Sequence, residues 1–231
     1  MQVAKQWGSE GWHRSIRDWR VVLLTLTTGA VDAVTFLVLG KVFSSVITGN
    51  MVLLGVAAAT HSLSEAIHSG IAIGGYSAGV LLGAPIAARG NDHGGTWPRS
   101  VTTTLAAELC VLSVSCIVWE LSGGRPHSGA QLALLVLFGA AMGMQSSAVR
   151  RLGQMSSTYL TSTLTGVLAS LVTGENPDGT GRSLGVLAAI VVGAMTGGIL
   201  ARTAYAWLPA VLLVPLILVV ASSAVLSNRV A

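Results

Sequence analysis

The 231 residues of this chain are 52% apolar and only 10% charged, with a formal net charge of +4. The mean hydropathy is +0.72, and soluble domains carry about 25% charged residues, so the composition excludes a soluble globular protein and indicates an integral membrane protein. Because the basic residues are scattered singly over the predicted loops, we expect no nucleic-acid partner.

Residues 1–20 are predicted to form an arm on the cytoplasmic surface of the membrane. Basic and aromatic side chains are interleaved there, as is typical of interfacial segments: Lys5, Arg14, Arg17 and Arg20 with Trp7, Trp12 and Trp19. The arm lacks a short apolar core followed by a small-residue cleavage site, so we do not predict a cleavable signal peptide. Residues 21–227 are predicted to form a single transmembrane domain.

Eight hydrophobic segments follow in chain order. They lie at about 21–40, 45–60, 67–88, 101–121, 131–150, 155–173, 183–203 and 207–227. A helix that crosses a bilayer needs about 20 residues, and segments 45–60 and 155–173 fall short in length or in hydrophobicity. We therefore predict an all-α polytopic protein with six transmembrane helices and two short re-entrant or broken half-helices.

The distribution of Lys and Arg supports this topology. If all eight segments crossed the membrane, seven basic residues would lie on the side of the N-terminus and six on the other. If the two short segments return to the side that they entered, ten lie inside: Lys5, Arg14, Arg17, Arg20, Arg89, Arg99, Arg150, Arg151, Arg182 and Arg229. Only Lys41, Arg125 and Arg202 then lie outside. Because cytoplasmic loops carry the excess of Lys and Arg, we predict six crossings of the inner membrane, with both termini in the cytoplasm.

Weak matches at an offset of 113 residues relate the two halves of the chain. They pair Leu39 with Leu152, Gly40 with Gly153, Ser44 with Ser157, Thr48 with Thr161 and Arg89 with Arg202. Each half, about 21–121 and about 131–227, then contains a span, a half-helix and two further spans. Since three crossings invert the second half relative to the first, we predict two inverted repeats, an arrangement found in many transporters.

Asp32 is the first candidate functional residue, because it lies inside the first predicted span. A charge at that depth costs at least about 2.5 kcal/mol, so such residues usually face a cavity, pair with another group or move a proton. Alternatively, Asp32 only caps or hydrogen-bonds a helix that is broken just after Gly29. In the 113-residue register Asp32 aligns with Gln145, and we expect the two polar groups to approach each other near the midplane.

The ends of the two half-helices are rich in hydroxyl and amide groups. Irregular backbone survives at membrane depth only where protein covers it or water reaches it, and unpaired N–H groups at a helix start attract anions. We therefore expect a central site for a small polar or anionic solute. The predicted substrate-binding residues are Asp32, Thr48, Gly49, Asn50, Gln145, Thr158, Thr161 and Thr163, with Ser44, Ser45, Ser157 and Ser162 beside them. Alternatively, the hydroxyl groups only bond to carbonyl groups of their own helices.

Glu108 is a second carboxyl group within a predicted span. Paired with Asp32, it would form a relay for proton coupling. Alone, it would be a core residue that hydrogen-bonds across helices. The sequence does not show whether the two side chains meet, so both interpretations stay open.

Glycines recur every four residues at Gly75, Gly79 and Gly83, and again at Gly193 and Gly197. Small residues at this interval let helix backbones pack closely, either within one chain or between two copies in a homo-oligomer. The common catalytic and nucleotide-binding motifs are missing, so we expect no enzymatic activity, cofactor or metal.

Two blocks of sequence resemble the YoaK-type family of bacterial integral membrane proteins of unknown function. The first comprises Gly29-Ala30-Val31-Asp32-Ala33, Leu39-Gly40-Lys41-Val42-Phe43 and Thr48-Gly49-Asn50. The second runs from Met142 through Gln145 to Gly153 and continues in Ser157-Thr158-Tyr159-Leu160-Thr161. Relatives usually carry Asn-Ala after the glutamine and Thr-Gly-Thr in the second block, where this chain has Ser146-Ser147 and Thr161-Ser162-Thr163. The resemblance covers about residues 20–205 and implies location and fold, without an activity.

From these features we expect a secondary transporter or facilitator for a small polar or anionic solute, coupled to protons through Asp32. A channel with the same architecture is the nearest alternative. In a third interpretation, the protein is a membrane scaffold or assembly partner that transports nothing, and its polar residues only hold helices together. Flux through reconstituted protein distinguishes the three.

Overall fold

The computed structural model describes residues 2–89, 97–152, 157–173 and 180–227. Its helices are α1 (Gln2–Val38), α2 (Ile47–Ala59), α3 (Leu63–Ala88), α4 (Arg99–Leu121), α5 (Ser128–Arg151), α6 (Ser157–Thr173), α7 (Thr180–Thr203) and α8 (Leu208–Ser227), with a 3-10 turn, η1 (Tyr205–Trp207), before α8. Each of the eight predicted hydrophobic segments corresponds to one helix. The predicted all-α fold is confirmed.

Within the described residues, six helices are long and apolar enough to cross a membrane. They are α1 from Arg17 onward, α3, α4, α5, α7 from Gly181 onward, and α8 together with the turn before it. Helix α2 and the apolar part of α6, Leu160–Thr173, are shorter. The predicted division into six spanning and two shorter helices is therefore confirmed.

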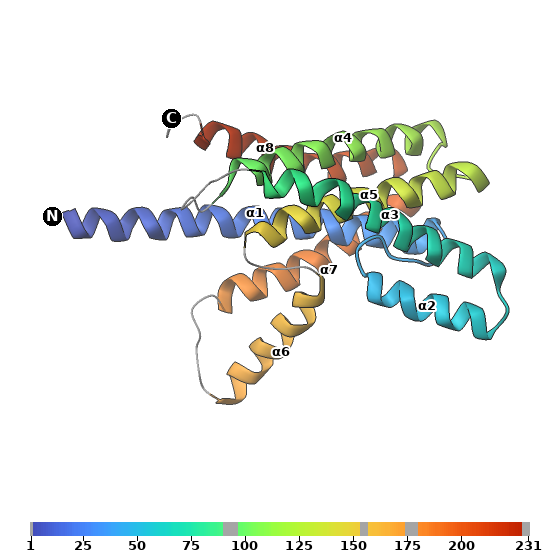
Figure 1. Cartoon of the computed structure of the whole chain (residues 1–231), viewed down its shortest axis with the longest axis horizontal. Helices are drawn as coiled ribbons and strands as arrows, with labels where there is room; N and C mark the ends of the chain where they lie inside the picture. Colours follow the sequence, from blue (N-terminus) through green and yellow to red (C-terminus); the bar gives the residue numbers. More distant parts are fainter. Residues whose placement is uncertain (1, 90–96, 153–156, 174–179, 228–231) are drawn as a thin grey trace.

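The six long helices lie side by side along the long axis of the molecule (Figure 1). The first residues of the α1 span, α4 and α7 and the last residues of α3, α5 and α8 lie at one end of this bundle, with both chain termini (Figure 1). Helix α2 starts partway along the bundle and runs back toward the end at which α1 finishes, whereas α6 starts partway and runs toward the opposite end (Figure 1). Whether these two shorter helices are re-entrant in a membrane stays a prediction.

Residues 2–16 continue α1 beyond the bundle (Figure 1). The predicted arm, residues 1–20, is thus joined to the first span as one helix, and its place on a membrane surface stays a prediction. Helix α1 is also continuous through Gly29 and Asp32. The prediction of a helix broken just after Gly29 is wrong, because no residue near it interrupts the hydrogen bonding of the helix.

Glycines bring two pairs of helices into close contact, α1 with α7 and α3 with α5. A Cβ atom on Gly79 would collide with the carbonyl oxygen of Ala140, and one on Gly193 would collide with the carbonyl oxygen of Leu26. Only a residue without a side chain permits this approach. The glycine stripes predicted as packing surfaces thus lie at helix interfaces within one chain.

The two glycine interfaces use equivalent contacts. Gly79 and Gly193 are separated by 114 residues, and so are the residues that they meet on the partner helices, Leu26 and Ala140. The same spacing relates Ala30 to Met144, Gly83 to Gly197 and Gly29 to Gly143. In both pairs the contacts advance in the same direction along the two helices, so both pairs are parallel. This register differs by one residue from the 113-residue offset of the sequence matches.

Helix α5 and the span of α1 are the two most buried of the six, with 67% and 50% of their most apolar stretches buried. They contribute Leu24, Val31, Leu134, Phe138 and Met142 to the hydrophobic core. Polar groups on these two helices are therefore separated from lipid by other helices, and the candidate site lies between them.

Candidate functional site

The chain reverses direction in residues 39–46, between α1 and α2. Gly40 has a φ of +115°, which L side chains rarely adopt. Glycine is also needed at position 40 for steric reasons, because a Cβ atom would collide with the imidazole ring of His68 in α3. The turn directs Ser44 and Ser45 back into the bundle, where both are buried.

Asp32 holds this returning segment. Its Oδ1 atom accepts hydrogen bonds from the backbone N–H of Ser44 at 2.8 Å, the hydroxyl of Ser44 at 2.7 Å and the backbone N–H of Ser45 at 2.9 Å. Its Oδ2 atom accepts a hydrogen bond from the hydroxyl of Ser45. Asp32 is only 7% exposed, so these bonds replace the water that a carboxylate loses on burial. The geometry supports a structural role for Asp32 in placing the start of α2.

Asn50 holds the same segment from within α2. Its Oδ1 atom accepts a hydrogen bond from the backbone N–H of Phe43 at 2.9 Å, and its Nδ2 atom donates one to the carbonyl oxygen of Phe43. Asn50 is fully buried, whereas Thr48 is exposed and Gly49 is half-buried. Residues 48–50 do not line the cavity described below. They belong to the start of α2, and Asn50 determines its position.

A cavity of about 60 Å³ lies between α1 and α5, next to the first residues of both half-helices. This volume holds a few water molecules or a solute of a few heavy atoms. Ser45 contributes from the segment before α2, and Leu160 contributes from the first turns of α6. The remaining lining residues are Val21, Leu24, Thr25, Thr28, Met142, Gln145, Ser146, Val149 and Val186. The segment just before α2 and the first turns of α6 therefore each contribute one residue to the cavity wall, and Ser45 connects the cavity to the buried Asp32.

Gln145 is the most polar group in the cavity wall. Its Nε2 atom donates hydrogen bonds to the carbonyl oxygen of Leu24 at 3.0 Å and to the hydroxyl oxygen of Thr28 at 3.1 Å. Its Oε1 atom is buried and has no hydrogen-bond partner among the described residues. An amide oxygen in that state costs about 1–3 kcal/mol unless a ligand or water satisfies it. Gln145 thus lines the cavity and carries an acceptor atom without a partner among the described residues.

Two threonines of α1 also line the cavity. The hydroxyl of Thr25 donates to the carbonyl oxygen of Val21 at 2.8 Å, and that of Thr28 donates to the carbonyl oxygen of Leu24 at 3.0 Å. The alternative that hydroxyl groups bond to their own helices is therefore correct for both. Each oxygen keeps lone pairs for a further hydrogen bond, because donation uses only the hydrogen.

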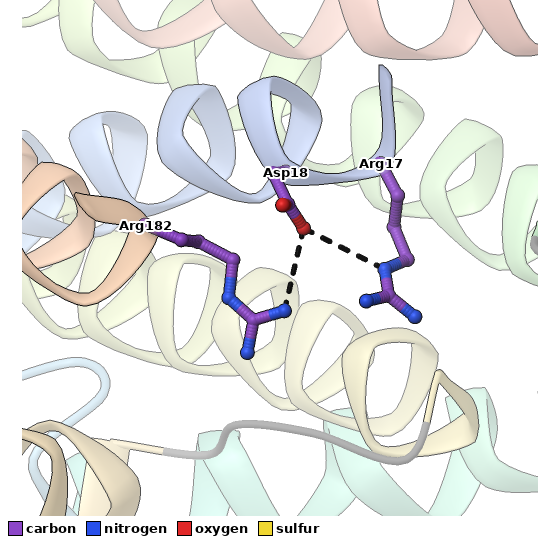
Figure 2. A network of polar contacts seen from close by, with 3 residues as sticks. All are labelled: Arg17, Asp18 and Arg182. Atoms are coloured by element: carbon purple, nitrogen blue, oxygen red, sulfur yellow. Dashed lines mark hydrogen bonds and ion pairs between the residues drawn. The ribbon is translucent and has the colours of Figure 1, made fainter. Parts of the chain in front are cut away.

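Three charged residues of α1 and α7 form an ion-pair network (Figure 2). The Oδ1 atom of Asp18 in α1 is 3.3 Å from Nη1 of Arg182 in α7 and 3.7 Å from Nε of Arg17. Asp18 precedes the lining residue Val21, and Arg182 precedes Val186. Because these three charged residues are half-buried at the same end of the bundle, they tie α1 to α7 between the cavity and that end.

Residues 21–223 match the family described as Protein of unknown function (DUF1275). The chain belongs to this family. It is 34% identical over 158 residues to the UPF0700 transmembrane protein YoaK of Bacillus subtilis (strain 168), and the match covers 67% of each chain. The predicted resemblance to the YoaK-type family is confirmed. No solved structure matches the chain.

Residues of the first sequence block hold the segment between α1 and α2 and thereby position the start of α2. Asp32 and Asn50 bond to the segment between α1 and α2, and Gly40 makes its turn possible. From the second block, Gln145 and Ser146 line the cavity. Ser45, which lies between two parts of the first block and bonds to Asp32, lines the same cavity wall as Gln145.

The predicted binding residues of α6 contribute less to the cavity of this DUF1275 protein. Thr161 is exposed and Thr163 is half-buried, and neither lines the cavity. The side chain of Thr158 lies outside the described residues. Helix α6 packs mainly on α7, and its described contribution to the wall is the apolar Leu160.

Glu108 does not pair with Asp32. It is fully buried within α4, and neither of its carboxyl oxygens has a hydrogen-bond partner among the described residues. The hydrogen bonds found for Asp32 come from Ser44 and Ser45. The structure therefore contains no direct relay between the two carboxyl groups.

Sequence analysis missed Thr25, Thr28 and Ser146 as lining residues and missed the Asp18–Arg182 ion pair. Thr25 and Thr28 are three residues apart, which places both on one face of a helix and could have indicated a polar face. The sequence does not show that this face lines a cavity with residues of α5. The ion pair joins residues 164 positions apart. No local pattern could have indicated it.

Proposed function

We propose that this DUF1275 protein is a secondary transporter or facilitator for a small polar solute, with the cavity between α1 and α5 as its binding site. The observation that carries this proposal is the acceptor atom Oε1 of Gln145, which is buried without a partner in the cavity wall. Buried polar groups in a packed core are usually hydrogen-bonded. The carboxyl group of Glu108 is also buried without a partner among the described residues, but Gln145 differs because it lines a cavity.

The paired helices support an alternating mechanism. Helix α1 of the first half packs on α7 of the second, and α3 of the first packs on α5 of the second, with glycine contacts that repeat after 114 residues. In this register α1 corresponds to α5 and α3 corresponds to α7. A two-fold axis in the membrane plane would therefore superpose the α1–α7 interface on the α5–α3 interface, as expected for inverted repeats. In such transporters the substrate lies at the interface of the two repeats. The cavity is lined by α1 of the first half and α5 of the second, in the part of the bundle near the start of the α1 span and the end of α5.

We assign proton coupling to Asp32 through Ser45. The carboxylate accepts the N–H groups of Ser44 and Ser45, and Ser45 lines the cavity. A proton on the carboxyl group removes acceptor capacity and thereby weakens the hold on this part of the wall. Glu108 has no such connection to the cavity, so the relay through Glu108 is not part of this proposal.

Flux through purified protein in proteoliposomes tests the proposal. A panel of small polar solutes is offered with and without a pH gradient, and the expected result is saturable uptake of at least one solute. Asp32→Asn should abolish the dependence on the gradient while Glu108→Gln keeps it. Uptake that does not saturate would favour a channel, and a panel in which nothing moves would favour the scaffold.

A further inference from the structure

The hydrogen-bond directions in the cavity wall determine which chemical class of solute fits. Gln145 has two possible orientations, since its amide nitrogen and oxygen are exchanged by a flip. The carbonyl oxygen of Leu24 is an acceptor only, so it must face the nitrogen of Gln145. The oxygen Oε1 is then the atom without a partner, and it needs a donor.

The threonine oxygens have the same polarity. The hydroxyl hydrogens of Thr25 and Thr28 are directed at carbonyl oxygens of α1, and the oxygen of Thr28 already accepts a hydrogen bond from Gln145. What Thr25 and Thr28 present to an occupant is therefore lone pairs rather than hydrogens. Together with Oε1 of Gln145, these threonine oxygens are hydrogen-bond acceptors, and the hydroxyl of Ser146 in the same wall can either donate or accept.

Positive charge is missing from the same wall. None of the described lining residues is basic. Of the basic residues close to them in sequence, Arg20 donates a hydrogen bond to Ser222 in α8, Arg150 is exposed and Arg182 faces Asp18. The N-terminal end of α2 is an anion-binding position in principle, but the N–H groups of Ser44 and Ser45 just before it already bind the Asp32 carboxylate. An anion in this cavity would find neither a counter-charge nor free donors among these groups.

We infer that the cavity binds a small hydrogen-bond-donating cation of the ammonium or primary-amine class. An N–H group satisfies Oε1 of Gln145 and the oxygen of Thr25, and the Asp32 carboxylate behind Ser45 attracts the positive charge. The volume of about 60 Å³ admits ammonium or methylammonium. This inference rests on the proposed function and narrows its small polar solute to a cation that donates hydrogen bonds.

Binding to the full-length protein in detergent tests the inference without requiring transport. The probes are ammonium, methylammonium, tetramethylammonium and formate at constant ionic strength, and the readouts are the melting temperature and calorimetric affinity. We expect ammonium and methylammonium to bind. Tetramethylammonium, which carries the charge without an N–H group, and formate should not. Binding of formate, or equal binding of tetramethylammonium and methylammonium, would overturn the inference.

Variants locate the site. Thr25→Val removes one acceptor and keeps the side-chain shape, and we expect about five-fold weaker methylammonium binding, as for the loss of one hydrogen bond. Thr203→Val is the matched control, because Thr203 is exposed in α7 and bonds to its own helix. Gln145→Leu should weaken binding more than about ten-fold, and Gln145→Glu, which keeps an oxygen at this position, should bind at least as tightly as the wild type. Equal affinity in Thr25→Val and Thr203→Val would contradict the assigned site.

Comparing binding with uptake distinguishes a failure of the transport proposal from a failure of the ligand inference. Methylammonium that binds but is not taken up by proteoliposomes leaves the ligand class standing and refutes transport of it. Saturable uptake of formate without uptake of methylammonium leaves transport standing and refutes the ligand class.

Discussion

Asp32 and Ser45 are joined twice, because the carboxylate accepts both the backbone N–H and the hydroxyl of the serine. Ser45 in turn forms part of the cavity wall. A charged group that lies 13 residues earlier in the chain thereby determines the position of a wall residue.

Removal of the Asp32 carboxylate should destabilise the protein. In Asp32→Ala the N–H groups of Ser44 and Ser45 stay buried without an acceptor, at a cost of about 1–3 kcal/mol for each group. The measurement is the melting temperature of the purified protein. Glu120→Ala is the control, since Glu120 is exposed at the end of α4. Equal melting temperatures for the two variants would show that the segment 44–45 is held by other contacts.

Alanine at an interface glycine should separate two helices. A Cβ atom at Gly79 or Gly193 meets backbone of the partner helix, which cannot move aside without shifting the whole helix. We expect each variant to lose at least about 2 kcal/mol of stability, comparable to overpacking in a protein core. Gly74→Ala lies in the same helix as Gly79 with no atom within 4 Å of the new Cβ, and it should unfold as the wild type does. Similar behaviour of Gly74→Ala and Gly79→Ala would contradict the close contact.

The Asp18–Arg182 ion pair should contribute little to stability. The two side chains are 31% and 20% exposed, and pairs that water reaches are worth about 0.2–1 kcal/mol. A double-mutant cycle with Asp18→Asn and Arg182→Gln measures their coupling energy, which should fall further at high salt. A coupling above about 3 kcal/mol would place the pair in a dry environment.

The orientation in the membrane can be tested by cysteine labelling. With Cys110 and Cys116 replaced by alanine, Arg125→Cys and Arg150→Cys introduce thiols at opposite ends of the bundle. A maleimide that does not cross membranes should label position 125 in intact spheroplasts and position 150 only after lysis, because the excess of basic residues is expected in the cytoplasm. The reverse pattern would invert the topology.

Much of the fold could be predicted from sequence, because length and hydrophobicity decide whether a helix can span a bilayer. Segment 45–60, for example, becomes α2 with bounds that differ by one or two residues. The direction of a side chain is not contained in such patterns. Asn50 and Gln145 are both polar amides in membrane segments, yet Asn50 bonds to the backbone of Phe43 and Gln145 keeps an oxygen unpaired.

The roles of Asp32 show the same limit. Its depth in the first span indicated a special function, but the choice between solute contact and structural support depends on where residues 44–45 return. That return depends on the positive φ of Gly40 and on the absence of a side chain there beside His68, which belongs to a different part of the chain, helix α3. Non-local contacts of this kind have no local signature.

The interleaving of the two halves has a consequence for synthesis. Helix α1 leaves the ribosome first, yet its main packing partners are α7 and α8. During insertion, the face of α1 around Gly29 that later contacts Ile190 and Ala194 is therefore exposed to lipid. It stays exposed until most of the chain has been translated. A product that stops after α4 lacks α7 and α8, which pack on α1, and α5, which is the main partner of α3. We therefore expect that neither half persists as a separate folded unit.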